Sequence, residues 1–295
     1  MTFPRISLIA AAGAVLFPVV ASAQSVMQIN SSLPEGSFAH VFLQEYETRL
    51  EAAAPGEIDV QIFMSNTLGK EEDVLQGLGF GTHQASLSAS AVAQINSRTS
   101  IFDLPYLFED RAAVQTFIDS PAGEMLADGF DGTGMVLAAM WDNGFRQITN
   151  NVRPVVTPDD LAGLKIRTPT NRQRVEMFNT LGANATPLSF GEVYSALDQG
   201  TIDGQENPAN VVDTAKLFEV QDYMSLSNHV YLPTFLMVGE PFLASLDEDL
   251  SATVISVAKE MASWSFDWGE TTDTETIAAL ADRIEINEID FAAFQ

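Results

Sequence analysis

Residues 163–172 read GLKIRTPTNR and join a predicted strand to a predicted helix. Leu164 and Ile166 alternate with basic residues, so one face of the strand is apolar and the other is charged. The overlapping segment NRQRVEMFNTLG (171–182) is predicted to be a helix that ends at Gly182. A strand that leads directly into a helix is the repeating unit of α/β folds, so this stretch indicates that class.

Basic residues gather around this strand although they are rare elsewhere. The chain has 14 Lys and Arg against 40 Asp and Glu, which gives a formal net charge of −26. Asp159 and Asp160 are the only acids inside the basic window. Because the remaining charge already keeps such a chain soluble, the window needs another explanation. Its six members are Arg146, Arg153, Lys165, Arg167, Arg172 and Arg174.

The overall composition limits the possible partners and cofactors. Strong acidity argues against nucleic acid or an anionic membrane surface as a partner. Cysteine is absent, which excludes disulfides, thiolate metal sites and a lipid-bearing cysteine. The three histidines, His40, His83 and His229, are widely separated in the sequence. We therefore predict neither a metal site nor a cofactor.

The N-terminus, MTFPRISLIAAAGAVLFPVVASAQ (1–24), has the pattern of a secretion signal. One arginine precedes a mostly apolar run that ends in small residues before Gln24. The run is short and interrupted by proline, which argues against the alternative of a retained membrane anchor. We therefore expect residues 1–23 to be removed and the mature protein to be secreted.

Strand and helix patterns alternate in the first part of the mature chain. Segment 38–54 has apolar residues close to helical spacing, and EIDVQIF (57–63) alternates as a strand does. A strand is also predicted within 25–37, a helix within 68–81 and a strand within 83–90. This rhythm predicts a mostly parallel sheet.

A second α/β unit is predicted to begin near Arg146. Within it, Ser189 is a candidate N-cap with Glu192 as its capping-box partner, and that helix ends at Gly200. A longer helix is predicted at about 247–284, with apolar residues spaced by three and four. We expect it to pack across both units, and the alternative is a coiled-coil face. Its apolar stripe comprises Leu250, Val254, Val257, Met261, Trp264 and Trp268.

Catalytic motifs are missing from the sequence. It contains no G-x-S-x-G, no H-E-x-x-H and no G-x-x-x-x-G-K-[ST]. Because carboxylates are so common here, a secreted hydrolase using Glu71, Glu72 or Glu206 as acid or base is an alternative without motif support. We therefore predict that the protein is not an enzyme.

The basic window fits the recognition of a carboxylate. A guanidinium group is always charged and presents a planar fork of donors that matches a carboxylate. Arg167 lies at the carboxyl end of its predicted strand, where open α/β sheets tend to bind ligands. Surface ion pairs are the alternative for Arg167 and Arg146. For Arg153, Arg172 and Arg174 such ion pairs are the preferred interpretation, the last two lying on a predicted helix surface.

Four segments resemble the DctP-type extracytoplasmic solute-binding proteins of tripartite ATP-independent periplasmic (TRAP) transporters. They are NGFRQITN (143–150), DLAGLKIRTP (160–169), PLSFGEVYSALDQGTIDGQENP (187–208) and NHVY (228–231). The likeness covers nearly the whole mature chain. It implies an α/β, two-lobed periplasmic binding protein fold with hinge strands and a long helix spanning both lobes, without catalysis.

The resemblance also implies a division into lobes. Lobe I would comprise 24–143 plus about 233–272, and lobe II 144–232 plus about 273–295. In the periplasm, the two lobes would close around a small organic acid and deliver it to the membrane permease of a TRAP transporter. A sensor-type binding protein for a chemoreceptor or a kinase is the alternative. Family members usually continue beyond the equivalent of Gln295, so if the chain is truncated, the terminal packing of one lobe would be incomplete.

Site residues follow from the same resemblance. Arg167 is expected to be the primary clamp on the ligand carboxylate, and Arg146 and Asn207 to complete its recognition. Asn207 has a second interpretation as a turn residue before Pro208. The weaker matches are Asn30, Glu72, Thr170, Phe190, Glu206 and His229.

Three of the weaker matches have simpler interpretations. Phe190 could serve helix-entry packing, Glu72 could be an exposed acid in a first helical turn, and His229 could be a hinge-strand histidine with a backbone partner. Thr170 stands where sialic-acid-binding relatives carry asparagine, and the segments LGKEE (68–72) and SLSASAVA (86–93) lack matching acids. Sialic acid is therefore not expected, and a sugar acid, a hydroxy or keto acid, or a C4-dicarboxylate fits better.

Overall fold

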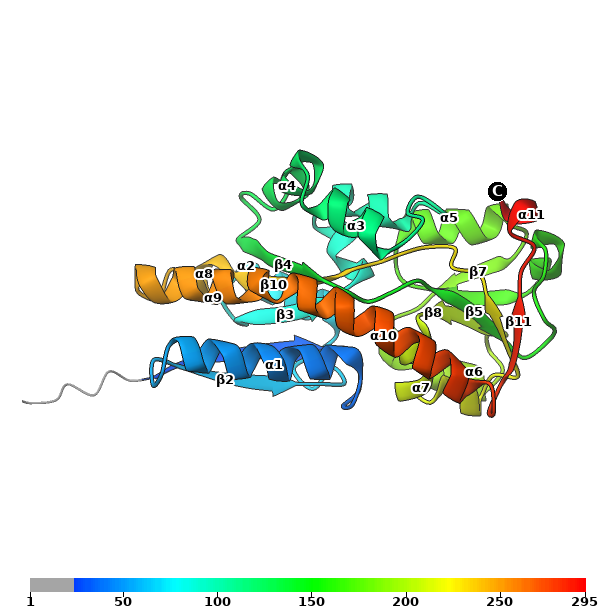
Figure 1. Cartoon of the computed structure of the whole chain (residues 1–295), viewed down its shortest axis with the longest axis horizontal. Coiled ribbons are helices and arrows are strands. Elements are labelled where there is room, and N and C mark those ends of the chain that lie inside the picture. Colours follow the sequence, from blue (N-terminus) through cyan, green and yellow to red (C-terminus); the bar gives the residue numbers. More distant parts are fainter. Residues whose placement is uncertain (1–23) are drawn as a thin grey trace, which may run out of the picture.

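The computed structural model describes residues 24–295, and the predicted signal segment 1–23 lies outside the described residues. Two β-sheets, each accompanied by helices, follow one another along the long axis of the molecule (Figure 1). The first sheet has the strand order β2-β1-β3-β10-β4, and the second has the order β11-β9-β5-β8-β6-β7. The α/β, two-lobed fold that the sequence predicted is therefore confirmed.

The first sheet is mixed, whereas the sequence predicted a mostly parallel one. Strand β1 runs parallel to β2 and β3, but β10 is antiparallel to both β3 and β4. The difference arises because β10 comes from far along the chain, outside the rhythm on which the prediction rested. The strands are β1 (Ser25–Ser31), β2 (Ile58–Phe63), β3 (Ala85–Ser88), β4 (Met135–Trp141) and β10 (Thr234–Gly239).

Successive side chains of β10 point to opposite faces of the first sheet and so contribute to both hydrophobic cores of the first lobe. Leu236 and Val238 join a core formed with α1 and α9, whereas Phe235 and Met237 join the core formed with α2 and α3. The helices of this lobe are α1 (Phe38–Ala53), α2 (Glu71–Gly79), α3 (Arg111–Ile118), α4 (Pro121–Asp128), α8 (Glu240–Leu243) and α9 (Glu248–Glu260). The 3₁₀ helices η1 (Ser90–Gln94) and η2 (Ser97–Asp103) connect β3 to α3.

The second sheet contains the strand that was predicted within residues 163–172. Leu164 and Ile166 are buried together in the core under α5, which confirms that they share one face. The strands are β5 (Gln147–Asn150), β6 (Lys165–Thr168), β7 (Asn184–Pro187), β8 (Gly204–Asn207), β9 (Tyr223–Leu226) and β11 (Glu285–Glu288). The helices are α5 (Arg172–Thr180), α6 (Val193–Asp198), α7 (Ala209–Thr214) and α11 (Phe291–Phe294).

The predicted helix at about 247–284 is divided in two. Helix α9 ends at Glu260, and α10 (Ala262–Leu280) begins after Met261. Helix α10 contacts β4 of the first sheet and α7 beside the second, so it packs across both lobes as predicted (Figure 1). No helix among residues 24–295 combines the length and apolar character needed to cross a membrane.

The predicted capping box at Ser189 and Glu192 does not form. Residues 190–192 make a 3₁₀ turn, and the Ser189 side chain makes no capping hydrogen bond. The Glu192 carboxylate lies instead 3.5 Å from the Lys70 ammonium group. The reciprocal capping bonds occur at Thr157 and Asp160, ahead of β6.

The chain passes between the sheets through paired segments. After β4 it enters β5 through Gly144, which has a φ of +107°, a value that favours glycine. The return segment from β9 to β10 pairs with the outward one through an antiparallel bridge between Phe145 and Tyr231. The sheets separate near the predicted lobe boundaries, and the exact boundaries stay a prediction.

Candidate functional site

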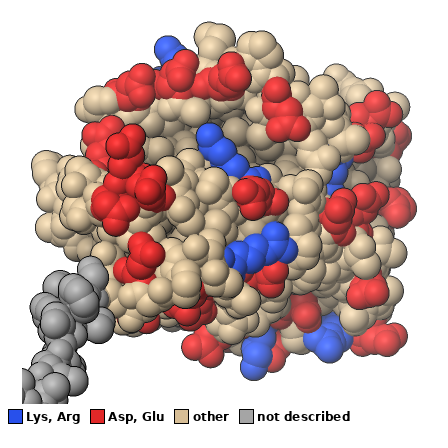
Figure 2. Space-filling view, turned by 60° about the vertical axis from the view of Figure 1, so that its left-hand side comes forward, with Lys and Arg blue, Asp and Glu red and all other residues tan. Residues whose placement is uncertain are grey.

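A cleft between the two sheets is the candidate site. Its walls come from both lobes, and the interface between two lobes is a usual place for a small-molecule site. On the face shown in Figure 2, acidic side chains are abundant and basic ones are few. Six of the predicted site residues line it: Glu72, Arg146, Arg167, Thr170, Phe190 and Asn207.

Arg167 projects into the cleft from the carboxyl end of β6. Its Nε and Nη2 groups donate to the carbonyl oxygen of Leu188 at 2.8 and 2.5 Å, and the guanidinium carbon lies 5.9 Å from the centre of the Phe190 ring. The residue is only 3% exposed, and burial lowers the pKa of Arg167 to about 9. No carboxylate among residues 24–295 forms an ion pair with this guanidinium. A buried cation without a counter-ion is costly, and an anionic ligand would remove that cost.

Arg146 is engaged by the protein itself. Its Nε donates to Oε2 of Glu206 at 2.5 Å, and its Nη2 donates to Oε1 of Glu206 at 3.1 Å and to Oδ1 of Asn207 at 2.9 Å. Its Nη1 group makes no hydrogen bond within the part of the chain that the structure describes. Because Arg146 also lines the cleft, Nη1 supplies two N–H donors for a ligand.

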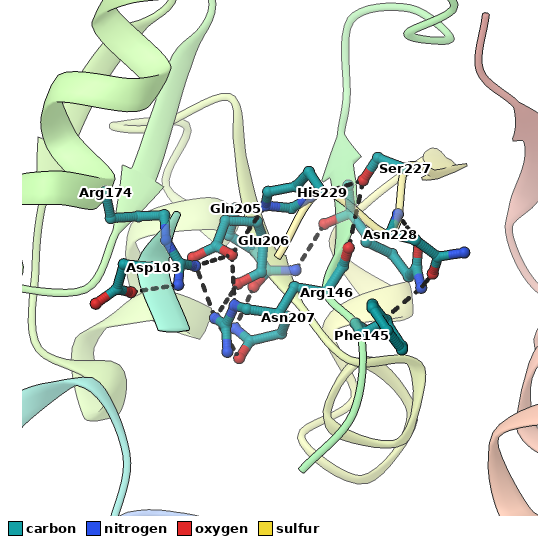
Figure 3. Close-up of polar contacts among 12 residues, drawn as sticks. Asp103, Phe145, Arg146, Arg174, Gln205, Glu206, Asn207, Ser227, Asn228 and His229 are labelled. Carbon is teal, nitrogen blue, oxygen red and sulfur yellow. Dashed lines mark hydrogen bonds and ion pairs between the residues drawn. The ribbon is translucent and has the colours of Figure 1, made fainter. Parts of the chain in front are cut away.

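Glu206 lies between two guanidinium groups. Besides Arg146, it accepts a hydrogen bond from Nη1 of Arg174 at 2.5 Å, as Figure 3 shows. Burial alone would raise the pKa of Glu206, but Arg146 and Arg174 outweigh it and hold that pKa well below its usual range. Glu206 is fully buried and does not line the cleft. It therefore holds Arg146 from behind, and its predicted contact with ligand stays a prediction.

Arg174 is fully buried, so the prediction that it makes a surface ion pair is wrong. Its Nη2 donates to Oδ1 of Asp103 at 2.6 Å, and Nδ2 of Asn171 donates to the other oxygen of Asp103 at 2.7 Å. Asn171 caps the helix and turns position 174 toward the interior, on the face that also buries Phe178. This contact joins η2 of the first lobe to α5 of the second.

Two other arginines of the window have separate outcomes. Arg172 is exposed and pairs with Glu176 at 2.7 Å, which confirms its predicted surface ion pair. Arg153 donates to the carbonyl oxygens of Asp160 and Ala162 at 2.7 and 2.8 Å, so its predicted surface ion pair is wrong. Backbone carbonyl groups of the turn that follows Arg153 in the chain take the place of a carboxylate partner.

His229 and Asn30 are buried and do not reach the cleft surface. His229 is hydrogen-bonded through Nδ1 to Ser227 Oγ at 2.8 Å and through Nε2 to Glu206 at 3.3 Å, and burial lowers its pKa. Asn30 accepts a hydrogen bond from the Leu68 N–H at 3.4 Å. The prediction that both contact ligand stays a prediction, and sequence matching gave no sign of their burial.

Thr170 connects the two lobes at the edge of the cleft. Its hydroxyl donates to Oε1 of Glu72 at 3.0 Å and accepts from Nε2 of Gln94 at 3.0 Å. Elsewhere in the second lobe, Nδ2 of Asn207 donates to Gln205, so both ends of the Asn207 amide already have protein partners. Glu72 and Thr170 thus help to hold the lobes together across the cleft.

One residue in the cleft was missed as a ligand contact. Glu71 lines the cleft beside Glu72, and its Oε1 accepts the Ala89 N–H at 2.7 Å while Oε2 accepts from Ser32 Oγ at 3.3 Å. Burial raises the pKa of Glu71 to about 7. In sequence it is one acid in a first helical turn, which gives no signal of its burial. No group of three His, Asp or Glu within residues 24–295 is arranged to hold a metal ion.

Comparisons with known proteins give a consistent result. Residues 29–295 match the model of the bacterial extracellular solute-binding protein family 7, DctP. The 2,3-diketo-L-gulonate-binding periplasmic protein YiaO of Escherichia coli is 32% identical over 86% of this chain and 77% of its own. The C4-dicarboxylate-binding periplasmic protein DctP of Rhodobacter capsulatus is 31% identical over 81% of this chain and 72% of its own. The crystal structure of a TRAP periplasmic solute-binding protein from Polaromonas with D-erythronate is 29% identical, with a TM-score of 0.88 over 92% of this chain and 90% of that one.

Proposed function

Because the chain belongs to the bacterial extracellular solute-binding protein family 7 (DctP), we propose that it is a TRAP-type receptor for a small organic acid. It binds the acid in the cleft and delivers it to a membrane permease. The acid belongs to one of three classes: sugar acids, hydroxy or keto acids, or C4-dicarboxylates. The observation that carries the proposal is the buried guanidinium of Arg167, which has a backbone partner but no ion-pair partner among the described residues.

In this proposal, Arg167 pairs with the ligand carboxylate and Arg146 adds donors through Nη1. A planar guanidinium matches two carboxylate oxygens, and charge-assisted hydrogen bonds are stronger than neutral ones. Asn207 and Glu206 keep Arg146 in place, since both accept hydrogen bonds from it. Because Glu206 already balances the positive charge of Arg146, the positive charge of Arg167 is left for the ligand.

Binding is coupled to closure of the lobes. Thr170 from the second lobe meets Glu72 and Gln94 from the first, so the two walls of the cleft are in contact here. A ligand that bridges both walls favours this arrangement over an open one. The connecting segments at Phe145 and Tyr231 act as the hinge, and the lobes comprise the residues that the sequence assigned to them.

Location and partners follow from the same family membership. The residues predicted as a secretion signal would take the protein to the periplasm, where the permease of a TRAP transporter faces it. The solute-binding role needs no catalytic group and no cofactor. Its partners are therefore the organic acid and the permease subunits.

Thermal denaturation of the mature protein against a panel of organic acids tests the proposal, since a ligand that binds only the folded state raises its melting temperature. Titration calorimetry then compares the wild type with Arg167→Ala. Loss of the buried clamp should cost about 2–5 kcal/mol of binding free energy, more than tenfold in affinity. Arg172→Ala removes an exposed arginine nearby and should bind like the wild type. Full binding by Arg167→Ala would contradict the proposal.

A further inference from the structure

Glu71 places a carboxylate in the same cleft as the arginine clamp. It is the first residue of α2 and belongs to the first lobe, whereas Arg167 belongs to the second. Both side chains line the cleft. The cleft therefore has a cationic wall and an anionic wall.

The surroundings of Glu71 leave part of its carboxylate free. One oxygen accepts a backbone N–H from Ala89 and the other accepts a hydroxyl from Ser32. The Ser88 hydroxyl also acts on this carboxylate, and a carboxylate offers about four acceptor sites, so at least one remains for a ligand. The Lys70 ammonium group is exposed and lies 3.5 Å from Glu192, not from Glu71.

We infer that the ligand is a polyhydroxy monocarboxylate, and that Glu71 excludes acids with a second carboxylate at the far end. This inference rests on the proposed function, because Arg167 must first hold the single carboxylate. Hydroxyl groups at the other end donate to Glu71 and satisfy its remaining acceptors. Relatives are named for both kinds of acid, 2,3-diketo-L-gulonate and C4-dicarboxylates, so the family alone does not decide between them.

The exclusion follows from the charges that face this end of the cleft. Glu72 lies beside Glu71 and also lines the cleft, and its charge contributes to the raised pKa of Glu71. A second ligand carboxylate would meet both glutamates, while a hydroxyl would find acceptors. Placing like charge against an incoming group is a usual way to reject the wrong ligand.

Pairs of acids that differ only at one end provide the test. Galactonate and galactarate share their carbon chain, and galactarate replaces the terminal alcohol with a carboxylate. D-Erythronate and meso-tartrate form a shorter pair of the same kind. Titration calorimetry at about pH 8, where Glu71 is ionised, should show that at least one alcohol-ended acid binds the wild type at least about tenfold more tightly than its dicarboxylate.

Glu71→Gln keeps the shape of the side chain and removes its charge. In this variant the preference within the pair should fall by at least about fivefold, mainly because the dicarboxylate binds more tightly. Asp73→Asn is the matched control, since it neutralises an exposed acid in the same helical turn that does not line the cleft. It should leave the preference unchanged.

A second measurement covers the case in which Glu71→Gln does not fold. Burial raises the pKa of Glu71 to about 7, so lowering the pH to about 6 protonates it and should weaken the wild-type preference in the same direction. Lys70, Glu72, Arg146 and Arg167 are the other charged groups that line the cleft and have to be considered in that comparison.

The outcomes separate the two proposals. This inference is overturned if the wild type binds the dicarboxylates as tightly as the alcohol-ended acids or more tightly. The proposed function stays intact in that case, provided that Arg167→Ala no longer binds the acid. An unchanged preference in Glu71→Gln, or at low pH if that variant does not fold, also overturns it. If no organic acid binds in a manner that depends on Arg167, both proposals are wrong.

Discussion

Arg174→Met tests the buried charge network behind the cleft. Methionine keeps much of the side-chain length but removes the charge, which leaves Asp103 without an ion-pair partner and Glu206 with Arg146 alone. Removing one partner of a buried ion pair costs about 3–5 kcal/mol of unfolding free energy. At roughly 2–4 °C per kcal/mol for a chain of this size, the melting temperature should fall by about 10 °C.

The assay is calorimetric or urea-induced unfolding of the mature protein without ligand. Arg172→Met is the control, because Arg172 lies two residues away in the same helix and its side chain is 84% exposed. It should change stability by no more than about 0.5 kcal/mol. A loss below about 1 kcal/mol for Arg174→Met would refute the reasoning, because it would mean that Arg174 is solvated.

A double variant separates charge pairing from simple packing. Asp103→Leu removes one of the two carboxylates that pair with Arg174, whereas Arg174→Met leaves the buried charge of Asp103 uncompensated. Combining both changes should therefore cost less than the sum of the two single losses. Strict additivity would indicate that the two side chains do not interact.

Three further predictions concern stability and binding. The pKa of Glu71 rises from 4.5 to about 7 on folding, so the stability of the folded protein should fall as the pH rises through that window. In urea unfolding, Glu71→Gln should be more stable than the wild type above pH 7 and equally stable near pH 4. Parallel stability curves for the two proteins would contradict this. In Gly269→Ala the new Cβ would lie 1.8 Å from Oδ2 of Asp142, so thermal unfolding should show a loss of about 2–4 kcal/mol in unfolding free energy. Wild-type stability of this variant would show that the helix can move aside. Phe190→Ala removes the ring beside Arg167 and should weaken carboxylate binding by about 0.5–2 kcal/mol in calorimetry, whereas an unchanged affinity would assign Phe190 to packing alone.

Much of the fold could be predicted because its signals are local. The strand around Ile166 and its apolar face follow from alternation, and helix ends follow from glycine and capping residues. The first sheet was less predictable, since β10 lies far along the chain from both of the strands that it pairs with, β3 and β4. The break between α9 and α10 at Met261 had no sequence signal that we recognise.

The candidate site was predictable in part. Arg167 stands out in sequence because basic residues are rare and this one ends a strand. Glu71 does not, because nothing in its neighbours indicates burial against Ala89 and Ser32. Glu206 was expected only as a ligand contact, and nothing in the sequence indicated that it pairs with Arg146 and Arg174.

By itself, the sequence determined the α/β class, the two units, the family and the scarcity of positive charge. Those properties depend on composition, periodicity and short motifs, which act over a few residues. Only the tertiary structure decided which charges pair: Arg146 meets Glu206 across 60 positions, and Arg174 meets Asp103 across 71. Charge pairing depends on distance and on exclusion of water, and both arise only when remote segments pack together.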